Sequence, residues 1–107
     1  MAKTSETLIE NVHPGLMLRE DFLDPLGITS YRLAKATGLS QSHVAELLKG
    51  KRSFTPETAI RIGEALGTSA EFWVNLQARH DLIETRRRRA SSSTVVTRLV
   101  DAATSTT

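Results

Sequence analysis

TSYRLAKATGLSQSHVAELLKGKR, residues 29–52, is the stretch that decides the fold. Counted from Ser30, an alanine stands at the fifth place (Ala34), a glycine at the ninth (Gly38), and apolar residues at the fourth, tenth, fifteenth and eighteenth. This spacing predicts a helix-turn-helix, because the first helix needs a small residue where the second crosses it and glycine accepts the left-handed backbone of the turn. At the eighth place, where an apolar residue is more usual, Thr37 is expected to pack through its methyl group.

Helix start and stop signals surround this motif. Pro14 begins a first helix that Pro25 and Gly27 end. Its Leu18, Phe22 and Leu26 repeat every four residues and Leu16 stands seven before Leu23, which predicts one buried face. The later helices are expected over residues 30–37, between the N-cap Ser40 and Gly50, and over residues 56–66 and 70–86. Five helices without a convincing strand predict an all-α domain.

Length and composition suit one small domain. The chain has 107 residues, no cysteine and a net charge of +2. We expect a loose segment over residues 1–12, a helix-turn-helix domain over residues 13–85, and a basic, Ser/Thr-rich tail over residues 86–107. Without a secretory leader or a membrane-length apolar run, the expected location is the cytoplasm.

Charge is distributed unevenly along the chain. Residues 1–27 carry two basic and five acidic side chains, whereas residues 28–70 carry six basic and three acidic ones. An acidic head beside a basic middle suggests two different partners, of which one is a polyanion.

The second helix of a helix-turn-helix enters the DNA major groove and reads base edges from its first turn. That turn offers Gln41, Ser42 and His43, with Glu46 one turn further on. Glutamine pairs with adenine, serine donates or accepts, and glutamate accepts from cytosine. We also expect phosphate contacts from basic and hydroxyl side chains that flank the motif. These are Tyr31, Arg32, Lys49, Lys51 and Arg52.

Features of an enzyme are scarce. The three histidines, His13, His43 and His80, stand far apart in the sequence, and none has the paired spacing of a metal site. No phosphate-binding glycine loop or nucleophile motif is present. The sequence therefore predicts a binding protein with no catalytic residue, metal or cofactor.

Two runs of sequence carry a family resemblance: HPGLMLREDFLDPLGITSYRLAKATGLSQSHVAELLKGKR (13–52) and FTPETAIRIGEALGTSAEFWVNLQARHDL (54–82). They resemble the HigA-type antitoxins, a branch of the Cro/C1-like, or lambda repressor-like, helix-turn-helix regulators. The resemblance implies a type II antitoxin that neutralises a HigB/RelE-like toxin cleaving messenger RNA. It also implies a homodimer that represses its own operon by binding operator DNA.

Carried onto this sequence, the resemblance implies dimerisation around Trp73 and Leu76 on the fifth helix. Because a ribonuclease must be basic to hold RNA, we expect the acidic side chains of the first helix, Glu20, Asp21 and Asp24, to dock the toxin. The tail after Thr85 is the alternative docking segment.

Two rival interpretations stay open. One is a repressor without a toxin partner, which keeps the same DNA-binding residues. The other is a protein-binding inhibitor whose helix-turn-helix serves only as a scaffold and shows no sequence-specific DNA binding.

Overall fold

The computed structural model describes residues 11–93 and 95–100. Its helices are α2 (Pro14–Met17), η1 (Leu18–Leu23), α3 (Asp24–Leu26), α4 (Ser30–Thr37), α5 (Gln41–Leu48), α6 (Pro56–Leu66) and α7 (Ala70–Ala90). The first three follow one another without a gap and form one rod, so the described residues contain five helical rods and no strand. The all-α prediction is confirmed.

The first rod widens into a π-helix over η1. In a π-helix the backbone bonds join residues five apart, and the N–H of Asp24 indeed donates to the carbonyl of Arg19. The two leucines that this rod buries fully, Leu18 and Leu23, are also five apart. The wide turn directly precedes Pro25, which lacks an N–H and would clash with a carbonyl in a regular helix. The predicted four-residue stripe is therefore wrong at its end, where Leu26 is 64% exposed.

Helices α4 to α7 each begin at a hydroxyl N-cap. The side-chain oxygens of Thr29, Ser40, Thr55 and Ser69 accept a hydrogen bond from the backbone N–H three residues later. These bonds satisfy donors that have no partner inside the helix. The starts of the two helix-turn-helix helices are therefore fixed locally, as the sequence predicted for Ser40.

The turn between α4 and α5 also follows the prediction. Gly38 has a φ of 77°, in the left-handed region that favours glycine. Thr37 is buried as expected, and its hydroxyl donates to the carbonyl of Leu33 at 2.8 Å, so the polar group is satisfied inside the core. From α6, the Arg61 guanidinium donates to the Thr37 carbonyl at 3.1 Å and ties the turn to the body.

Trp73 is at the centre of the core, with 0% of its surface exposed. Its ring stacks on Phe54 with centroids 4.9 Å apart and an interplanar angle of 7°, and its indole N–H donates to Thr68 at 2.8 Å. One turn along α7, the amide oxygen of Gln77 accepts from the Phe54 N–H at 2.8 Å. The loop that follows α5 is thus fastened to α7 at Phe54.

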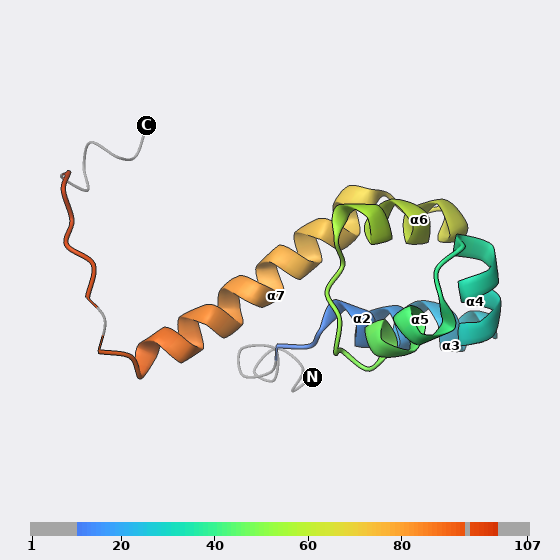
Figure 1. Cartoon of the computed structure of the whole chain (residues 1–107), viewed down its shortest axis with the longest axis horizontal. Coiled ribbons are helices and arrows are strands. Elements are labelled where there is room, and N and C mark those ends of the chain that lie inside the picture. Colours follow the sequence, from blue (N-terminus) through green and yellow to red (C-terminus); the bar gives the residue numbers. More distant parts are fainter. Residues whose placement is uncertain (1–10, 94, 101–107) are drawn as a thin grey trace, which may run out of the picture.

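Helix α7 runs beyond the body of the domain (Figure 1). It continues through the four arginines Arg86–Arg89 to Ala90, past the predicted end at residue 86. Arginine is a good helix former, and basic side chains in the last turn interact favourably with the helix dipole. The described residues of the tail beyond residue 93 are not helical.

The N-terminal arm contacts α7. The Asn11 side chain donates to the carbonyl of His80 at 2.8 Å and to the carboxylate of Glu84 at 3.1 Å. Most of the segment predicted to be loose, residues 1–10, and residues 94 and 101–107 of the tail lie outside the described residues. No helix in the described part combines the length and the apolar character needed to cross a membrane.

Candidate nucleic-acid interface

The outer face of α5 is polar and open. Gln41 and Ser42, in its first turn, are both exposed. Val44, Leu47 and Leu48 are buried on the opposite side. Two adjacent polar side chains therefore lie together on a free face, as the sequence predicted for a helix that reads bases.

His43 is less available than its neighbours. Its ring is half-buried, and Nε2 lies 3.3 Å from the hydroxyl of Thr58 in α6. Burial lowers its pKa below the ordinary value, the charge of Arg52 lowers it further, and Glu46 opposes both. His43 therefore faces the start of α6 with an uncharged ring near neutral pH, which sets it apart from Gln41 and Ser42.

Glu46 and Arg52 form an ion pair that the sequence did not reveal. One carboxylate oxygen of Glu46 accepts from Nε of Arg52 at 3.1 Å and from Nη2 at 2.8 Å. The left-handed turn at Gly50, with φ 76°, precedes Lys51 and Arg52. The sequence predicts base reading for Glu46 and phosphate contact for Arg52, but the structure joins the two residues beside α5.

Cationic side chains flank α5 on both sides. Arg32 is exposed in the first turn of α4, and Lys49 and Lys51 are exposed just after α5. Tyr31, also in the first turn of α4, is 55% exposed, and the ammonium group of Lys35 lies 5.8 Å from its ring centroid. Phosphate oxygens are commonly bound by such side chains and by helix N-termini.

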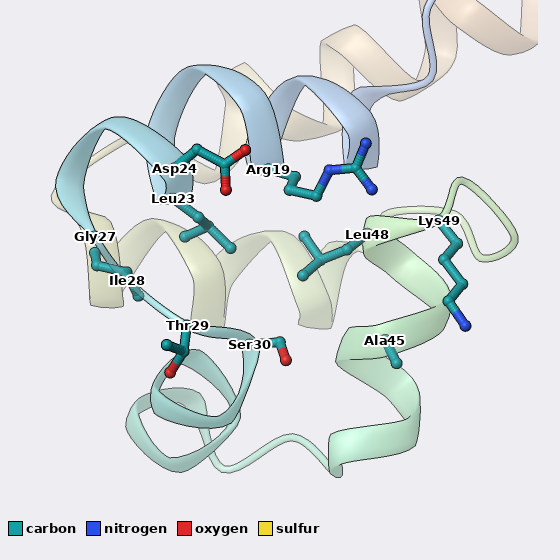
Figure 2. Close-up of a pocket in the computed structure, with 10 residues that line it drawn as sticks. All are labelled: Arg19, Leu23, Asp24, Gly27, Ile28, Thr29, Ser30, Ala45, Leu48 and Lys49. Carbon is teal, nitrogen blue, oxygen red and sulfur yellow. The ribbon is translucent and has the colours of Figure 1, made fainter.

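A hollow of about 660 Å³ borders the same surface (Figure 2). Apolar side chains of Leu23, Ile28 and Leu48 line it together with Ser30 at the start of α4 and Lys49 after α5. Arg19 from η1 also lines it, a cation far in the sequence from the helix-turn-helix residues predicted to contact phosphate. Arg19 therefore lies on this side of the domain, because it lines the same hollow as Ser30 and Lys49.

The acidic candidates for protein docking lie on the first rod. Glu20, Asp21 and Asp24 are exposed. Asp24 lines the hollow of Figure 2, whereas Glu20 and Asp21 do not. The acidic group thus reaches the edge of the α4–α5 surface through Asp24.

The predicted dimerisation residues differ in their surroundings. Trp73 is enclosed by its own core, so its assignment to a dimer contact needs correction. Leu76 is half-buried on α7. Phe72 and Ile83, at helical spacings from Leu76, are 39% exposed and half-buried, respectively. An apolar stripe of Phe72, Leu76 and Ile83 therefore follows α7 out of the body.

Two of the histidines that stand far apart in the sequence come together in the fold. The rings of His13 and His80 lie 5.0 Å apart, centroid to centroid. His13 is the N-cap of α2, as expected of a helix-start residue, because its Nδ1 accepts from the N–H of Gly15 at 2.8 Å. Within residues 11–93 and 95–100, no group of three or more His, Asp or Glu side chains is placed to hold a metal ion.

Comparison with known proteins agrees with this geometry. A helix-turn-helix family model (HTH_3) matches residues 18–73. Antitoxin HigA-1 of Vibrio cholerae serotype O1 is 44% identical over 77 residues, which are 72% of each chain. Virulence-associated protein I of Dichelobacter nodosus is 34% identical over 91 residues, covering 85% of this chain and 84% of that protein.

Solved structures show the same likeness. The Pseudomonas aeruginosa antitoxin HigA, solved with the higBA promoter, superposes with a TM-score of 0.78 at 30% identity, over 85% of this chain and all of the other. Antitoxin GraA in complex with its operator gives a TM-score of 0.69 at 31% identity, over 80% of this chain and 92% of the other. The helix-turn-helix, the fold and the sequence identity agree: the chain belongs to the HigA family of helix-turn-helix antitoxins.

Proposed function

We propose that this chain is the antitoxin of a type II toxin–antitoxin module. It neutralises a HigB/RelE-like toxin that cleaves messenger RNA, and as a homodimer it represses its own operon by binding double-stranded operator DNA. We propose a binding protein rather than an enzyme. The observation that carries the DNA half is the exposed pair Gln41 and Ser42 at the start of α5, flanked by cations on both sides.

Base reading falls first on Gln41 and Ser42. Glutamine offers a donor and an acceptor to the adenine edge, and serine pairs with several bases. His43 takes a lesser part, because Thr58 already occupies the direction of its Nε2. Glu46 and Arg52 act as a pair, because an ion pair joins them.

Phosphate contacts position the helix in the groove. We assign them to Tyr31 and Arg32 on one side of α5 and to Lys49 and Lys51 on the other. Arg19 is added because it lines the hollow in Figure 2 together with Lys49 and Ser30. Two clusters on either side of a reading helix suit the two phosphate backbones that border one major groove.

Dimerisation is assigned to the apolar stripe of Phe72, Leu76 and Ile83. Trp73 supports this surface from behind, since its ring packs against Phe72 at 4.8 Å, centroid to centroid. A two-fold axis at α7 repeats the reading helix on the partner subunit, and such a dimer reads a palindromic site.

Toxin docking is assigned to Glu20, Asp21 and Asp24. A ribonuclease surface is basic, and an exposed acidic cluster attracts it over distances of about a Debye length, roughly 8–10 Å. The tail after Thr85 is the alternative segment. Its described residues carry exposed apolar side chains (Val95, Val96, Leu99 and Val100), but its arginines oppose a basic partner.

A repressor without a toxin partner is the second candidate, supported by the exposed Gln41 and Ser42 on α5, because DNA binding at this surface would not require a toxin. Expression with the neighbouring reading frames, followed by mass analysis of the purified complex, tests the first proposal. A small basic protein should co-purify with the chain, and the upstream DNA should be retained more strongly than random DNA at equal salt. Retention without a protein partner would favour the second candidate. A partner without sequence-specific retention would favour the scaffold interpretation.

A further inference from the structure

The ion pair of Glu46 and Arg52 lies on the side of α5 assigned to DNA. Glu46 is four residues after Ser42, so the two side chains share one face of the helix. Both partners are exposed, Arg52 at 45% and Glu46 at 48% of the side chain. Exposed ion pairs contribute little to folding stability, so the fold itself does not account for this pair.

A carboxylate alone at this place would oppose DNA. A duplex carries one negative charge about every 1.7 Å along its axis, and an unpaired Glu46 would be repelled by it. Arg52 neutralises Glu46 and is in turn held by two hydrogen bonds to one oxygen, at 3.1 and 2.8 Å. The guanidinium therefore has a defined orientation before DNA arrives.

The hydrogen bonds to Glu46 leave part of the guanidinium free. Arginine has five N–H donors in a planar fork. Nε and Nη2 each give one N–H to Glu46, and among the described residues the guanidinium forms no other hydrogen bond. The edge formed by Nη1 and the second N–H of Nη2 presents two parallel donors. Guanine presents O6 and N7 as two adjacent acceptors in the major groove, and arginine is the commonest partner of this edge.

We infer that Arg52 reads a guanine in the major groove and that Glu46 positions it, an inference that rests on the proposed DNA binding. Arg52 is thus a base-reading residue and not one of the phosphate contacts that the sequence predicts. Glu46 acts on specificity through Arg52 rather than by accepting from a cytosine.

The test uses the full chain and the duplex from upstream of its gene. Each guanine in turn is replaced by 7-deazaguanine, which lacks the N7 acceptor, and the dissociation constant is measured for the wild type, Arg52→Ala and Glu46→Gln. Lys51→Ala, the neighbouring cation, is the matched control. Circular dichroism verifies that the variants fold.

At one guanine of each half-site, replacement by 7-deazaguanine should lower the affinity of the wild-type protein by about 5- to 150-fold. Arg52→Ala should bind the unmodified duplex more weakly and lose nothing further at that guanine. Lys51→Ala should keep the wild-type guanine profile. Glu46→Gln should lose part of the discrimination at the same guanine while binding random DNA more tightly, because a negative charge is gone. If Glu46 had only a structural role, Glu46→Gln would instead lower the affinity for both the upstream duplex and random DNA.

If the wild type prefers the upstream duplex to random DNA, two results would overturn the inference but leave the proposed DNA binding intact. In the first, Arg52→Ala weakens all sequences equally and keeps the wild-type guanine profile, as a phosphate contact would. In the second, Glu46→Gln relaxes preference at a cytosine and Arg52→Ala changes no guanine. A wild type without any sequence preference would overturn the proposed DNA binding and this inference together.

Discussion

His13 and His80 lie edge to face between the start of α2 and the middle of α7, at an interplanar angle of 68°. Nδ1 of His13 caps α2 by accepting from Gly15, and Nδ1 of His80 is buried without a hydrogen-bond partner in the described structure. Burial lowers the pKa of His13 below its ordinary value of 6.5, the neighbouring His80 lowers it further, and Asp81 opposes both. A proton on the His13 ring would disturb this junction.

The junction predicts that acid destabilises the domain. The unfolded chain binds a proton at His13 near pH 6.5, whereas the folded chain resists it to a lower pH. The contribution of uncharged His13 to the free energy of unfolding is therefore complete above about pH 6.5, and it decreases as the pH falls toward the pKa of His13 in the folded chain. Urea unfolding midpoints at pH 7.5 and pH 5 measure the effect. His13→Asn keeps a capping oxygen and should flatten the dependence, leaving the share of His43, whose pKa is also lowered. An unchanged profile in this variant would exclude His13 as the source.

Gly15 should tolerate no side chain. An added Cβ would lie 1.7 Å from the carbonyl oxygen of Leu47, on the backbone of α5. Gly15→Ala should lower the free energy of unfolding by about 3 kcal/mol or more, since the backbone of α5 must move. Gly67→Ala is the control, because its Cβ would meet nothing within 4 Å and only its left-handed φ of 74° opposes it, at about 1–2 kcal/mol. Equal losses in the two variants would contradict the close packing of α2 on α5.

Alanine substitutions of Gln41 and Lys51 should affect DNA binding in different ways. Gln41→Ala removes a base contact, so it should weaken operator binding by about 1–3 kcal/mol and relax preference at one base pair. Lys51→Ala should weaken all sequences about equally and lower the slope of log affinity against log salt by about 1. Fluorescence anisotropy on specific and random duplexes at several salt concentrations separates the two. A loss from Gln41→Ala that is equal on both duplexes would show that α5 reads DNA with another face.

The dimer surface is tested by two matched isoleucines. Ile83 belongs to the apolar stripe on α7, whereas the 45% exposed Ile60 lines a shallow groove between α6 and α7. Ile83→Asp should convert the dimer into a monomer, because it places a charge in an apolar interface. Ile60→Asp should leave the dimer intact. Sedimentation velocity measures both, and the reverse result would move the interface to the α6–α7 groove.

Charge reversal tests the toxin surface. Replacing Glu20 and Asp24 by lysine should slow association with the toxin at low salt by about 10-fold or more, with a smaller effect at high salt. Glu64→Lys, an exposed reversal on α6, is the control. Stopped-flow association rates give the result. If the rate is unchanged but truncation after Thr85 abolishes binding, the tail is the docking segment.

Local rules explain why much of the fold was predictable. Ser40, Gly38, Pro56 and Gly67 act on their immediate neighbours, and the structure has each at the predicted helix start or end. The exposed side chains of Gln41 and Ser42 follow directly from the register of α5, which the buried Val44 and Leu47 define.

The differences arise from an irregular helix and from contacts between separate segments. The π-helix before Pro25 places the two fully buried leucines, Leu18 and Leu23, five residues apart, so Leu26 stays exposed although the four-residue repeat predicted it to be buried. Trp73 is enclosed because Phe54, nineteen positions earlier in the chain, stacks on it. The sequence predicted the helix end at Gly50, where φ is 76°, but it did not predict the ion pair that Glu46 and Arg52 form across this turn.

The anchoring of Phe54 has a consequence for the thermodynamics of DNA binding. The short segment between α5 and α6 is held near one end by the turn at Gly50 and near the other by the bond from Phe54 to Gln77. Ordering one flexible residue costs roughly 1–2 kcal/mol of backbone entropy, and for Lys51 and Arg52 this loss accompanies folding instead of association. Preorganisation of this kind favours a tight complex even though the segment contributes few atoms. Gln77, buried in the core, is therefore a residue whose replacement by alanine would loosen Lys51 and Arg52 and reduce the affinity for DNA, with a larger loss on the operator than on random DNA because Arg52 reads a guanine.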